Sequence, residues 1–108
     1  MSYCVYIMAS RPFGALYTGS AGNLRAAVER HRAGQGNSHT AQYKIDRLVW
    51  FEAHDSRAEA LTREKRIKRW VRQWKFDLIS KFNPDWRDLT DTLPSAAAGE
   101  APDQVRGG

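Results

Sequence analysis

Apolar runs in the first half of the chain predict a small sheet and one helix. Residues 3–9 and 15–19 are rich in apolar, aromatic and β-branched residues and are separated by a stretch with proline and glycine. They predict a β-hairpin with an irregular turn. Residues 47–53, RLVWFEA, predict a third strand. Between them, Asn23 can cap a helix whose apolar positions recur at helical spacing, so this helix is expected to pack one face on the sheet. That face comprises Leu24, Ala27, Val28 and His31.

The second half of the chain is predicted to be helical. A serine and a glutamate at the ends of 56–59 have the spacing of a capping box, which predicts a helix that runs through Trp70. An apolar pattern then predicts a further helix, interrupted near Arg72. Residues 83–89, NPDWRDL, are expected to cap the domain, and residues 34–43 are expected to form a loop or a short helical turn.

One domain with a tail is the expected organisation. Residues 1–90 carry the patterned apolar positions, and from residue 91 the chain loses its large hydrophobic residues and becomes rich in Ala, Gly and Pro. Such a segment buries too little apolar surface to order itself, so residues 91–108 are predicted to be a flexible tail. A monomer is the default expectation.

Composition narrows the environment and the partner. The chain has 17 basic against 12 acidic residues, a net charge of +5, which suits a polyanion such as nucleic acid. A single cysteine forbids an intramolecular disulfide, and the three histidines are not spaced as zinc ligands. No signal peptide or membrane-spanning segment is predicted, so we expect a cytoplasmic protein.

Glu64 is the most informative single position. At 100° per residue it falls on the same arc as Ala60 and Ile67, which places a carboxylate on the apolar stripe of its helix. An unpaired carboxylate is costly to bury, so it normally has a cation partner, a metal ion or a raised pKa. From the residues alone, an ion pair with a neighbouring arginine and a metal site are both open.

Seven basic residues surround that glutamate within positions 63–75. They predict a cationic helix face that is either simply solvated or holds phosphates. The face comprises Lys65, Arg66, Arg69 and Arg72, with Lys68 at its edge. Trp70 and Trp74, four residues apart on the apolar side, are expected to be core residues rather than platforms for bases.

Tyr6, Tyr17 and His31 have ordinary structural interpretations when each is taken alone. Tyrosine is common in strands for packing, and a histidine on an apolar helix face is more often packed than catalytic. Only in combination with the other motifs do these residues point to chemistry.

Taken in order, the motifs resemble the GIY-YIG nuclease superfamily, and in particular its small stand-alone bacterial proteins. The resemblance covers nearly everything from residue 3 to about residue 89. It is carried by CVYIM (4–8), LYTG (16–19), NLRAAVERH (23–31), LVWFE (48–52), ALTREKRIKRW (60–70) and NPDWRDL (83–89). It implies a small α/β (α+β) domain with a three-stranded antiparallel sheet flanked by helices.

The resemblance also implies an activity, the hydrolysis of a DNA phosphodiester with one divalent cation, Mg²⁺ or Mn²⁺. Tyr6 and Tyr17 match the two motif tyrosines, one of which orients or deprotonates the attacking water. Glu64 matches the metal-binding glutamate, and His31 matches a position near the scissile phosphate. Gly19 matches the last motif glycine, which lets the backbone approach a phosphate closely. The cationic residues Lys65, Lys68, Arg69 and Arg72 are the expected DNA contacts.

Ala27 departs from the family pattern, because the catalytic arginine of the family occupies this position. An arginine there would clamp the phosphate, and the loss of such a donor commonly costs about 100- to 1,000-fold in rate. Arg25 points about 160° away around the helix. Arg30, about 60° away and one turn on, is the better substitute.

Three functions therefore remain open at this level. The first is a metal-dependent DNA endonuclease weakened by Ala27. The second is a nucleic-acid-binding module of the same fold that has lost catalysis. The third is a protein-interaction domain that uses an exposed part of the Trp70 and Trp74 surface.

Overall fold

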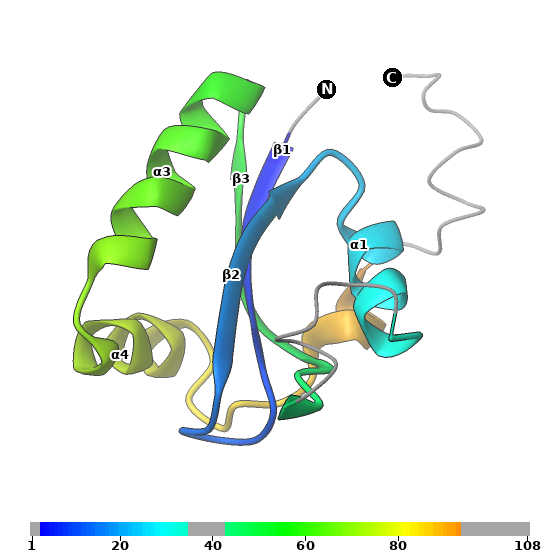
Figure 1. Cartoon of the computed structure of the whole chain (residues 1–108), viewed down its shortest axis with the longest axis vertical. Helices are drawn as coiled ribbons and strands as arrows, with labels where there is room; N and C mark the ends of the chain where they lie inside the picture. The colour runs from blue at the N-terminus through cyan, green and yellow to red at the C-terminus, as the bar shows by residue number, and fades with distance from the viewer. Residues whose placement is uncertain (1–2, 35–42, 94–108) are drawn as a thin grey trace.

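A three-stranded antiparallel sheet forms the middle layer of the molecule (Figure 1). The computed structural model describes residues 3–34 and 43–93. The central strand β1 (Tyr3–Ala9) pairs with β2 (Leu16–Ala21) on one side and with β3 (Arg47–His54) on the other. The three strands predicted from the sequence are confirmed, and the sheet with helices on both faces is the predicted α+β fold. Residues 35–42, most of the predicted loop, lie outside the described residues.

The central strand β1 is buried on both faces, and its alternation divides the core in two. Val5, Ile7 and Ala9 face the layer that contains α3 and α4, whereas Tyr6 and Met8 face the layer that contains α1. Successive side chains of a strand point to opposite faces, so one residue's position in β1 decides which helix it meets.

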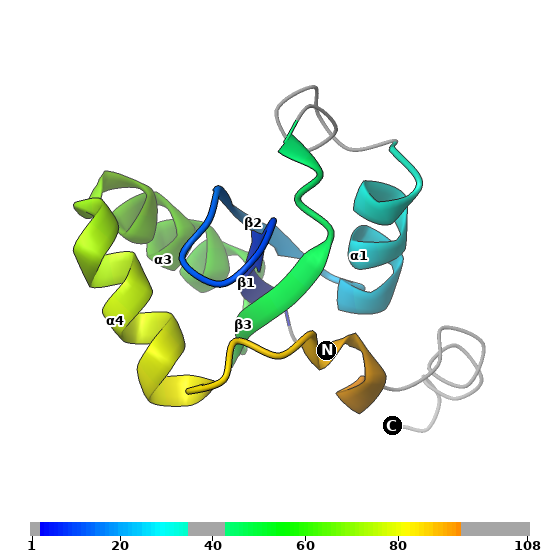
Figure 2. The ribbon, with the colours of Figure 1, turned by 90° about the horizontal axis from the view of Figure 1, so that it is seen from below.

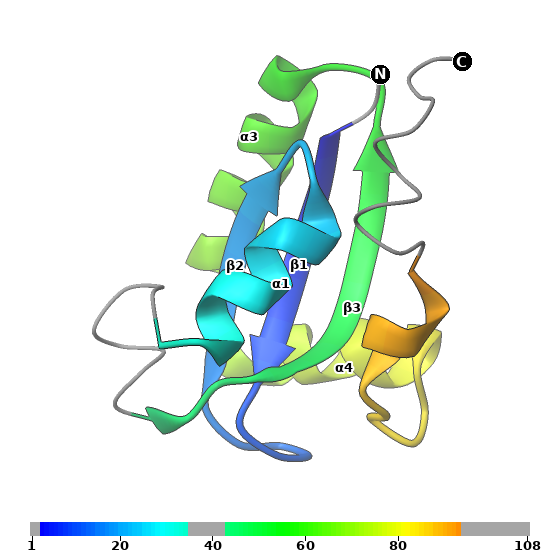
Figure 3. The same ribbon diagram turned by 90° about the vertical axis from the view of Figure 1, so that its right-hand side faces the viewer.

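Helix α1 (Leu24–Arg32) packs on the sheet through the face that the sequence predicted (Figure 3). The Asn23 side chain accepts a hydrogen bond from the backbone N–H of Ala26 at 3.0 Å, which satisfies one of the donors left unpaired at a helix start. The buried residues of this helix are Leu24, Ala27, Val28 and His31.

Helices α3 (Arg57–Arg69) and α4 (Arg72–Phe82) cover the opposite face (Figure 2). The Ser56 hydroxyl caps α3 by accepting from the backbone N–H of Glu59. Trp70 and Val71 are both extended, so the helical path breaks there and α4 runs in a new direction. The prediction of an interrupted helix is confirmed. The prediction that Trp74 is a core residue is wrong, because its side chain is 57% exposed.

The segment after α4 closes the domain around Trp86, which is 1% exposed. Its indole N–H donates to the Ser80 hydroxyl at 2.9 Å, and its ring packs against Phe13 and Phe76. The short 3-10 helix η1 (Leu89–Thr92) follows and lies on the α1 side of the sheet. Most of the predicted tail, from residue 94 onward, lies outside the described residues.

A search of the described residues for a membrane-spanning helix found none of sufficient length and apolar character.

Candidate active site

Tyr6, Tyr17 and His31 meet between the sheet and α1, and together they are called the phenol cluster below. The Tyr6 hydroxyl and His31 Nε2 are 3.1 Å apart, in a buried hydrogen bond that joins residues 25 positions apart in sequence. The ring centroid of His31 lies 4.8 Å from that of Tyr17 and 6.1 Å from that of Tyr6. Three residues whose separate interpretations were structural therefore form one contiguous group.

The surroundings set the protonation states of the phenol cluster. Burial raises the pKa of Tyr6 well above its usual range, and the neighbouring Tyr17 and Glu64 raise it further. Burial and the positive charge of Arg30 lower the pKa of His31. At neutral pH, Tyr6 therefore keeps its proton and His31 is a neutral imidazole. When His31 carries its proton on Nδ1, the phenol donates and Nε2 accepts.

Gly19 is required by the packing of the two tyrosines. A Cβ atom at this position would lie 2.9 Å from the Tyr6 hydroxyl oxygen and 2.9 Å from Cε2 of Tyr17. Both distances are shorter than real Cβ atoms show, so any side chain would displace the rings. The sequence analysis expected this glycine to let the backbone approach a phosphate, and that stays a prediction; the structure adds that the two phenols occupy the position of a Cβ atom.

Glu64 projects from α3 toward the edge strand β2, where it is held by two groups. The Ser20 hydroxyl donates to its Oε1 at 2.6 Å, and the Lys68 ammonium lies 2.6 Å from its Oε2. The Glu64 side chain is only 14% exposed. The ion pair considered from the sequence exists, but its partner is a lysine one turn on rather than an arginine. Ser20, Glu64 and Lys68 are called the carboxylate edge below.

The phenol cluster and the carboxylate edge meet across strand β2. Gly19 and Ser20 are consecutive, so one faces the phenols and the other faces α3. The Glu64 charge contributes to the raised pKa of Tyr6, which means that the two groups interact electrostatically through the strand edge. A hydrogen-bonded phenol and imidazole and a carboxylate paired with a lysine thus lie at one edge of the sheet.

The arginines of α1 have different surroundings. Ala27 is 1% exposed and packs in the core between α1 and the sheet. The Arg25 guanidinium donates to the carbonyls of Thr90 and Leu93, so it anchors η1 and points away from the site, as predicted. The exposed Arg30 has no hydrogen bond or ion pair within residues 3–34 and 43–93, and its charge acts on both Tyr6 and His31. Among the described cations of α1, Arg30 is therefore the one whose charge affects the phenol cluster.

The predicted cationic face is divided by the break between α3 and α4. Lys65 and Arg69 are exposed on α3, and neither is hydrogen-bonded or ion-paired to any residue that the structure describes. Arg72 lies elsewhere, because its guanidinium donates to the Gly14 carbonyl at 2.6 Å, in the turn between β1 and β2. The hydrogen bonds of Arg72 are therefore made to the turn between β1 and β2, and they hold the hairpin against α4.

The donor set of the carboxylate edge fits a hard divalent cation. A carboxylate and a hydroxyl oxygen are ligands of the type that Mg²⁺ prefers, and Mg²⁺ usually binds through one or two carboxylates, waters and substrate phosphates. The Lys68 ammonium already lies against Oε2, so this oxygen is accessible to a positively charged group. Among the described residues, no group of three or more His, Cys, Asp or Glu side chains gathers as a metal cage. A site completed by water and substrate is the arrangement that these residues allow.

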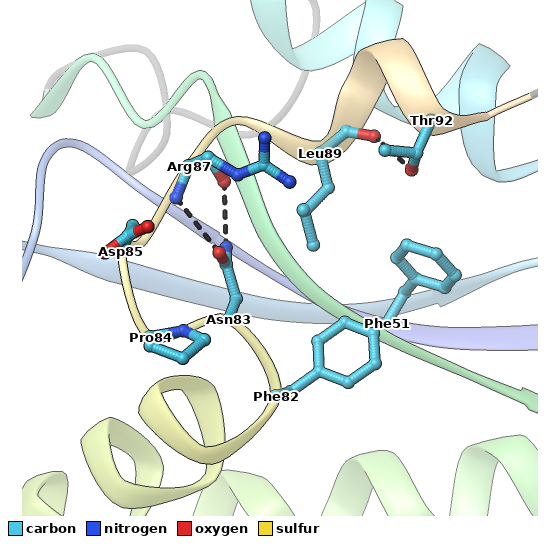
Figure 4. Close-up of a pocket in the computed structure, with 8 residues that line it drawn as sticks. All are labelled: Phe51, Phe82, Asn83, Pro84, Asp85, Arg87, Leu89 and Thr92. Atoms are coloured by element: carbon cyan, nitrogen blue, oxygen red, sulfur yellow. Dashed lines mark hydrogen bonds between the residues drawn. The ribbon is translucent and has the colours of Figure 1, made fainter.

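A cavity of about 400 Å³ lies elsewhere on the molecule, where α4 passes into η1 (Figure 4). The rings of Phe51 and Phe82 meet edge to face along it, and the Asn83 side chain bonds the backbone of Arg87 in both directions. None of the residues predicted to be functional lines this cavity. It is formed by the closing segment of the fold and is separate from the candidate active site.

Two contacts of the site were missed by the sequence analysis although the sequence contained a sign of each. Glu64 and Lys68 have the i, i+4 order that favours an ion pair on a helix. Ser20 follows Gly19, so strand alternation places it on the face opposite to Gly19. The hydrogen bond from Ser20 to Glu64 spans 44 positions and depends on how α3 docks on β2.

The chain is similar to known proteins in sequence and in fold. A family model described as the GIY-YIG catalytic domain matches residues 2–88. UPF0213 proteins from Staphylococcus aureus strains Mu3 and COL are 41% identical over 80 residues, which are 74% of this chain and 96% of each relative. The solution NMR structure of a UPF0213 protein from Bacillus halodurans is similar with a TM-score of 0.52 and 27% identity. It covers 88% of this chain and 100% of its own.

Proposed function

Because the chain belongs to the GIY-YIG family, we propose that it is a divalent-metal-dependent endonuclease that hydrolyses phosphodiester bonds of DNA. The observation that carries the proposal is the buried hydrogen bond between Tyr6 and neutral His31 beside the carboxylate of Glu64. A structural core has no need for a proton acceptor and a cation-binding carboxylate at one strand edge. Residues 1–90 would form the functional unit, acting as a cytoplasmic monomer.

Glu64 and Ser20 are the residues that would hold the cation, Mg²⁺ or Mn²⁺. When bound, such an ion polarises a phosphoryl oxygen and offsets the negative charge that develops in hydrolysis. Lys68 must leave Oε2 of Glu64 for this to happen, and its exposed side chain can then move toward a substrate phosphate. The exposed cations Lys65 and Arg69 on the same helix would hold neighbouring phosphates.

The phenol cluster would handle the proton of the attacking water. As the water oxygen forms its bond to phosphorus, its proton passes to the Tyr6 oxygen, and the Tyr6 proton passes to Nε2 of His31. The bond from phosphorus to the leaving oxygen breaks, and that oxygen takes a proton from solvent. His31 can be the final acceptor because it is neutral at the start, whereas the raised pKa of Tyr6 makes its phenolate alone a rare species. Tyr17, against the imidazole, would position the water.

Arg30 would supply the positive charge that Ala27 does not. Its charge already acts on both members of the hydrogen-bonded pair. Arg30 is exposed and lies one turn further along α1 than position 27. Its guanidinium would therefore approach the phosphate from a different direction than an arginine at position 27, and we expect slow turnover.

A binding module without catalysis is the second candidate function, and Ala27 is the observation that favours it. In that case the cationic helix would bind nucleic acid with a strong dependence on salt, and the loss of Glu64 would not weaken binding.

A cleavage assay distinguishes the two candidates. Supercoiled plasmid and branched DNA are incubated with Mg²⁺ or Mn²⁺ and the natural protein, Glu64→Ala or Ala27→Arg. Cleavage by the natural protein that Glu64→Ala abolishes supports the endonuclease. Cleavage by Ala27→Arg alone supports the binding module, and no cleavage by any of the three contradicts the endonuclease.

A further inference from the structure

Lys75 is a partly buried cation that the proposed function leaves unexplained. It lies near the start of α4. Among residues 3–34 and 43–93, no group accepts a hydrogen bond from its ammonium or forms an ion pair with it. An ammonium that has lost part of its hydration normally has a partner that offsets this loss. Lys75 therefore carries a positive charge that the described residues do not balance.

The charged groups that act on Lys75 are cations as well. Arg72 lies three residues earlier on α4, and Lys68 lies near the end of α3. Burial and the charges of these two residues lower the pKa of Lys75. At 100° per residue, the acidic residue of α4, Asp77, points to another side of the helix, where it accepts a hydrogen bond from Gln73. Lys68, Arg72 and Lys75 are called the corner cluster below.

The two neighbours of Lys75 differ in what holds them. The Arg72 guanidinium donates to the Gly14 carbonyl at 2.6 Å and lies 4.7 Å from the centre of the Phe76 ring, so its charge is fixed at the corner. The Lys68 ammonium lies 2.6 Å from Oε2 of Glu64, and its side chain is half exposed. A lysine side chain has a flexible four-carbon stem. Lys68 is therefore the member of the corner cluster that can change its partner.

The corner cluster adjoins the carboxylate edge. Both groups contact the hairpin of β1 and β2, Glu64 through Ser20 and Arg72 through Gly14. Lys68 belongs to both, since it pairs with Glu64 one turn earlier on α3 and its charge acts on Lys75. Figure 1 shows how α3 leads directly into α4 at this corner. The residues that would hold a divalent cation and the corner cluster are thus neighbours, with Lys68 between them.

We propose that the corner cluster is a phosphate-binding site, and that Lys68 completes it when a divalent cation replaces the Lys68 ammonium on Glu64. The part of this inference that concerns the cation rests on the proposed function. A released Lys68 ammonium beside Lys75 adds to the repulsion at the corner. A phosphate oxyanion relieves this repulsion, because both ammonium groups can donate to its oxygens while Arg72 contributes its charge.

Cooperative binding follows from this arrangement. The cation favours the state in which Lys68 has left Glu64, and the phosphate favours the same state. Each ligand therefore raises the affinity for the other by the same factor. Lys68 would act as the link between them.

Phosphate binding without metal tests the proposal. Inorganic phosphate is added at constant ionic strength, and the NMR shifts of the backbone amides of residues 68–75 report binding. The natural protein is expected to bind weakly. Glu64→Gln removes the carboxylate that holds Lys68 and should strengthen phosphate binding by up to about 5-fold, the range for a partly exposed ion pair. Lys75→Met should weaken binding by about 5-fold in the natural protein and in Glu64→Gln.

Two controls separate the site from a simple effect of net charge. Glu64→Gln also removes a charge that repels phosphate, but in a Lys68→Met background its gain should disappear, because no ammonium is left to release. A gain that persists overturns the role of Lys68. Lys81→Met removes an exposed lysine near the other end of α4 and should leave phosphate affinity unchanged. Equal weakening by Lys75→Met and Lys81→Met overturns the site.

Dimethyl phosphate, a diester, distinguishes the two sources of the phosphate group. If it binds about as tightly as inorganic phosphate and depends on Lys75, the site takes a phosphate of a nucleic-acid backbone. If only inorganic phosphate binds, the site takes a free phosphate group. Mg²⁺ should strengthen dimethyl phosphate binding more in the natural protein than in Lys68→Met. Equal strengthening in the two proteins overturns the link through Lys68.

DNA cleavage separates this proposal from the proposed function. If phosphate binding follows Lys75 and Lys68 as expected but the protein never cuts DNA, the endonuclease fails and the phosphate site stands. If the protein cuts DNA with Mg²⁺ but Lys75→Met leaves phosphate binding unchanged, the endonuclease stands and the phosphate site fails.

Discussion

The phenol cluster and the carboxylate edge lie on opposite faces of one strand and have opposite electrical character. Tyr6 and His31 are buried, neutral and bonded to each other. Glu64 and Lys68 are charged, and the lysine side chain is half exposed. Burial shifts the pKa values of Tyr6 and His31 toward their neutral forms, which suits a group that moves a proton. Solvent contact of the Lys68 side chain lowers the free-energy cost of charge at the carboxylate edge, where the proposed cation would bind.

Consecutive residues of β2 separate these two environments. Gly19 has no side chain because the phenols occupy its space, and Ser20 presents a hydroxyl to Glu64. A one-residue shift in the pairing of β2 with β1 would exchange the two faces and destroy both groups. The hairpin register is thus as important to the site as the identity of the side chains.

The largest expected effects come from two substitutions, one in the carboxylate edge and one in the phenol cluster. Glu64→Gln should reduce cleavage about 1,000-fold and abolish Mn²⁺ binding, because the carboxylate is the main ligand. Tyr6→Phe should reduce cleavage to a similar extent and leave Mn²⁺ binding unchanged. Calorimetric titration with Mn²⁺ and single-turnover cleavage measure the two effects. Glu59→Gln, an exposed acid on the same helix, is the control. Loss of Mn²⁺ binding in Tyr6→Phe would contradict the assignment of proton transfer to the phenol cluster and of metal binding to the carboxylate edge.

A change at Gly19 should damage the phenol cluster and leave the carboxylate edge intact. The Cβ of Gly19→Ala would clash with both tyrosine rings, so the free energy of unfolding should fall by about 1–3 kcal/mol. Urea denaturation measures this loss, and Mn²⁺ affinity should persist. Gly22→Ala is a suitable control because its Cβ meets Tyr3 at the milder distance of 3.2 Å. Equal losses in the two variants would contradict the packing role assigned to Gly19.

The competition between Lys68 and a metal for Glu64 should be measurable. Lys68→Met removes the ammonium from Oε2, so Mn²⁺ should bind up to about fivefold more tightly, the range expected for a partly exposed ion pair. Lys65→Met removes an exposed lysine that has no partner among the described residues, and it should not change the affinity. Weaker Mn²⁺ binding in Lys68→Met would mean that the lysine helps to position the carboxylate.

The smallest effect is a shift in the pH dependence of cleavage. Because the pKa of His31 is lowered, its neutral form should persist below pH 6.5, and the acid limb of the pH–rate profile should lie below that value. Arg30→Gln removes one cause of the lowering and should move the limb upward, toward pH 6.5. An NMR titration of the His31 ring checks the assignment. An acid limb that does not move with Arg30 would contradict the charge coupling.

The free energy of unfolding should also depend on pH through the protonation of His31. Below pH 6.5 the unfolded chain binds a proton at this histidine that the folded protein resists, so this contribution to stability decreases as the pH falls. His31→Phe should remove that part of the pH dependence in thermal melts.

Much of the fold could be predicted from short-range pattern. The buried face of α1 was predicted residue by residue, since one periodic stripe is enough to say which side chains share a face. Glu64 was singled out for the same reason, as a carboxylate on an apolar stripe. The pattern was misleading at Trp74, because periodicity does not say whether another layer covers the face. It was also misleading at Arg72, where the break after α3 turns the side chain toward the hairpin.

The order and spacing of the motifs determined by themselves the sheet, its helices and the family to which the chain belongs. Only the tertiary structure decided which side chains meet. The bond from Tyr6 to His31 spans 25 positions and that from Ser20 to Glu64 spans 44, and both depend on helices docking on opposite faces of one strand. The lowered pKa of His31 and the raised pKa of Tyr6 depend on burial, a property of the packed core rather than of either residue.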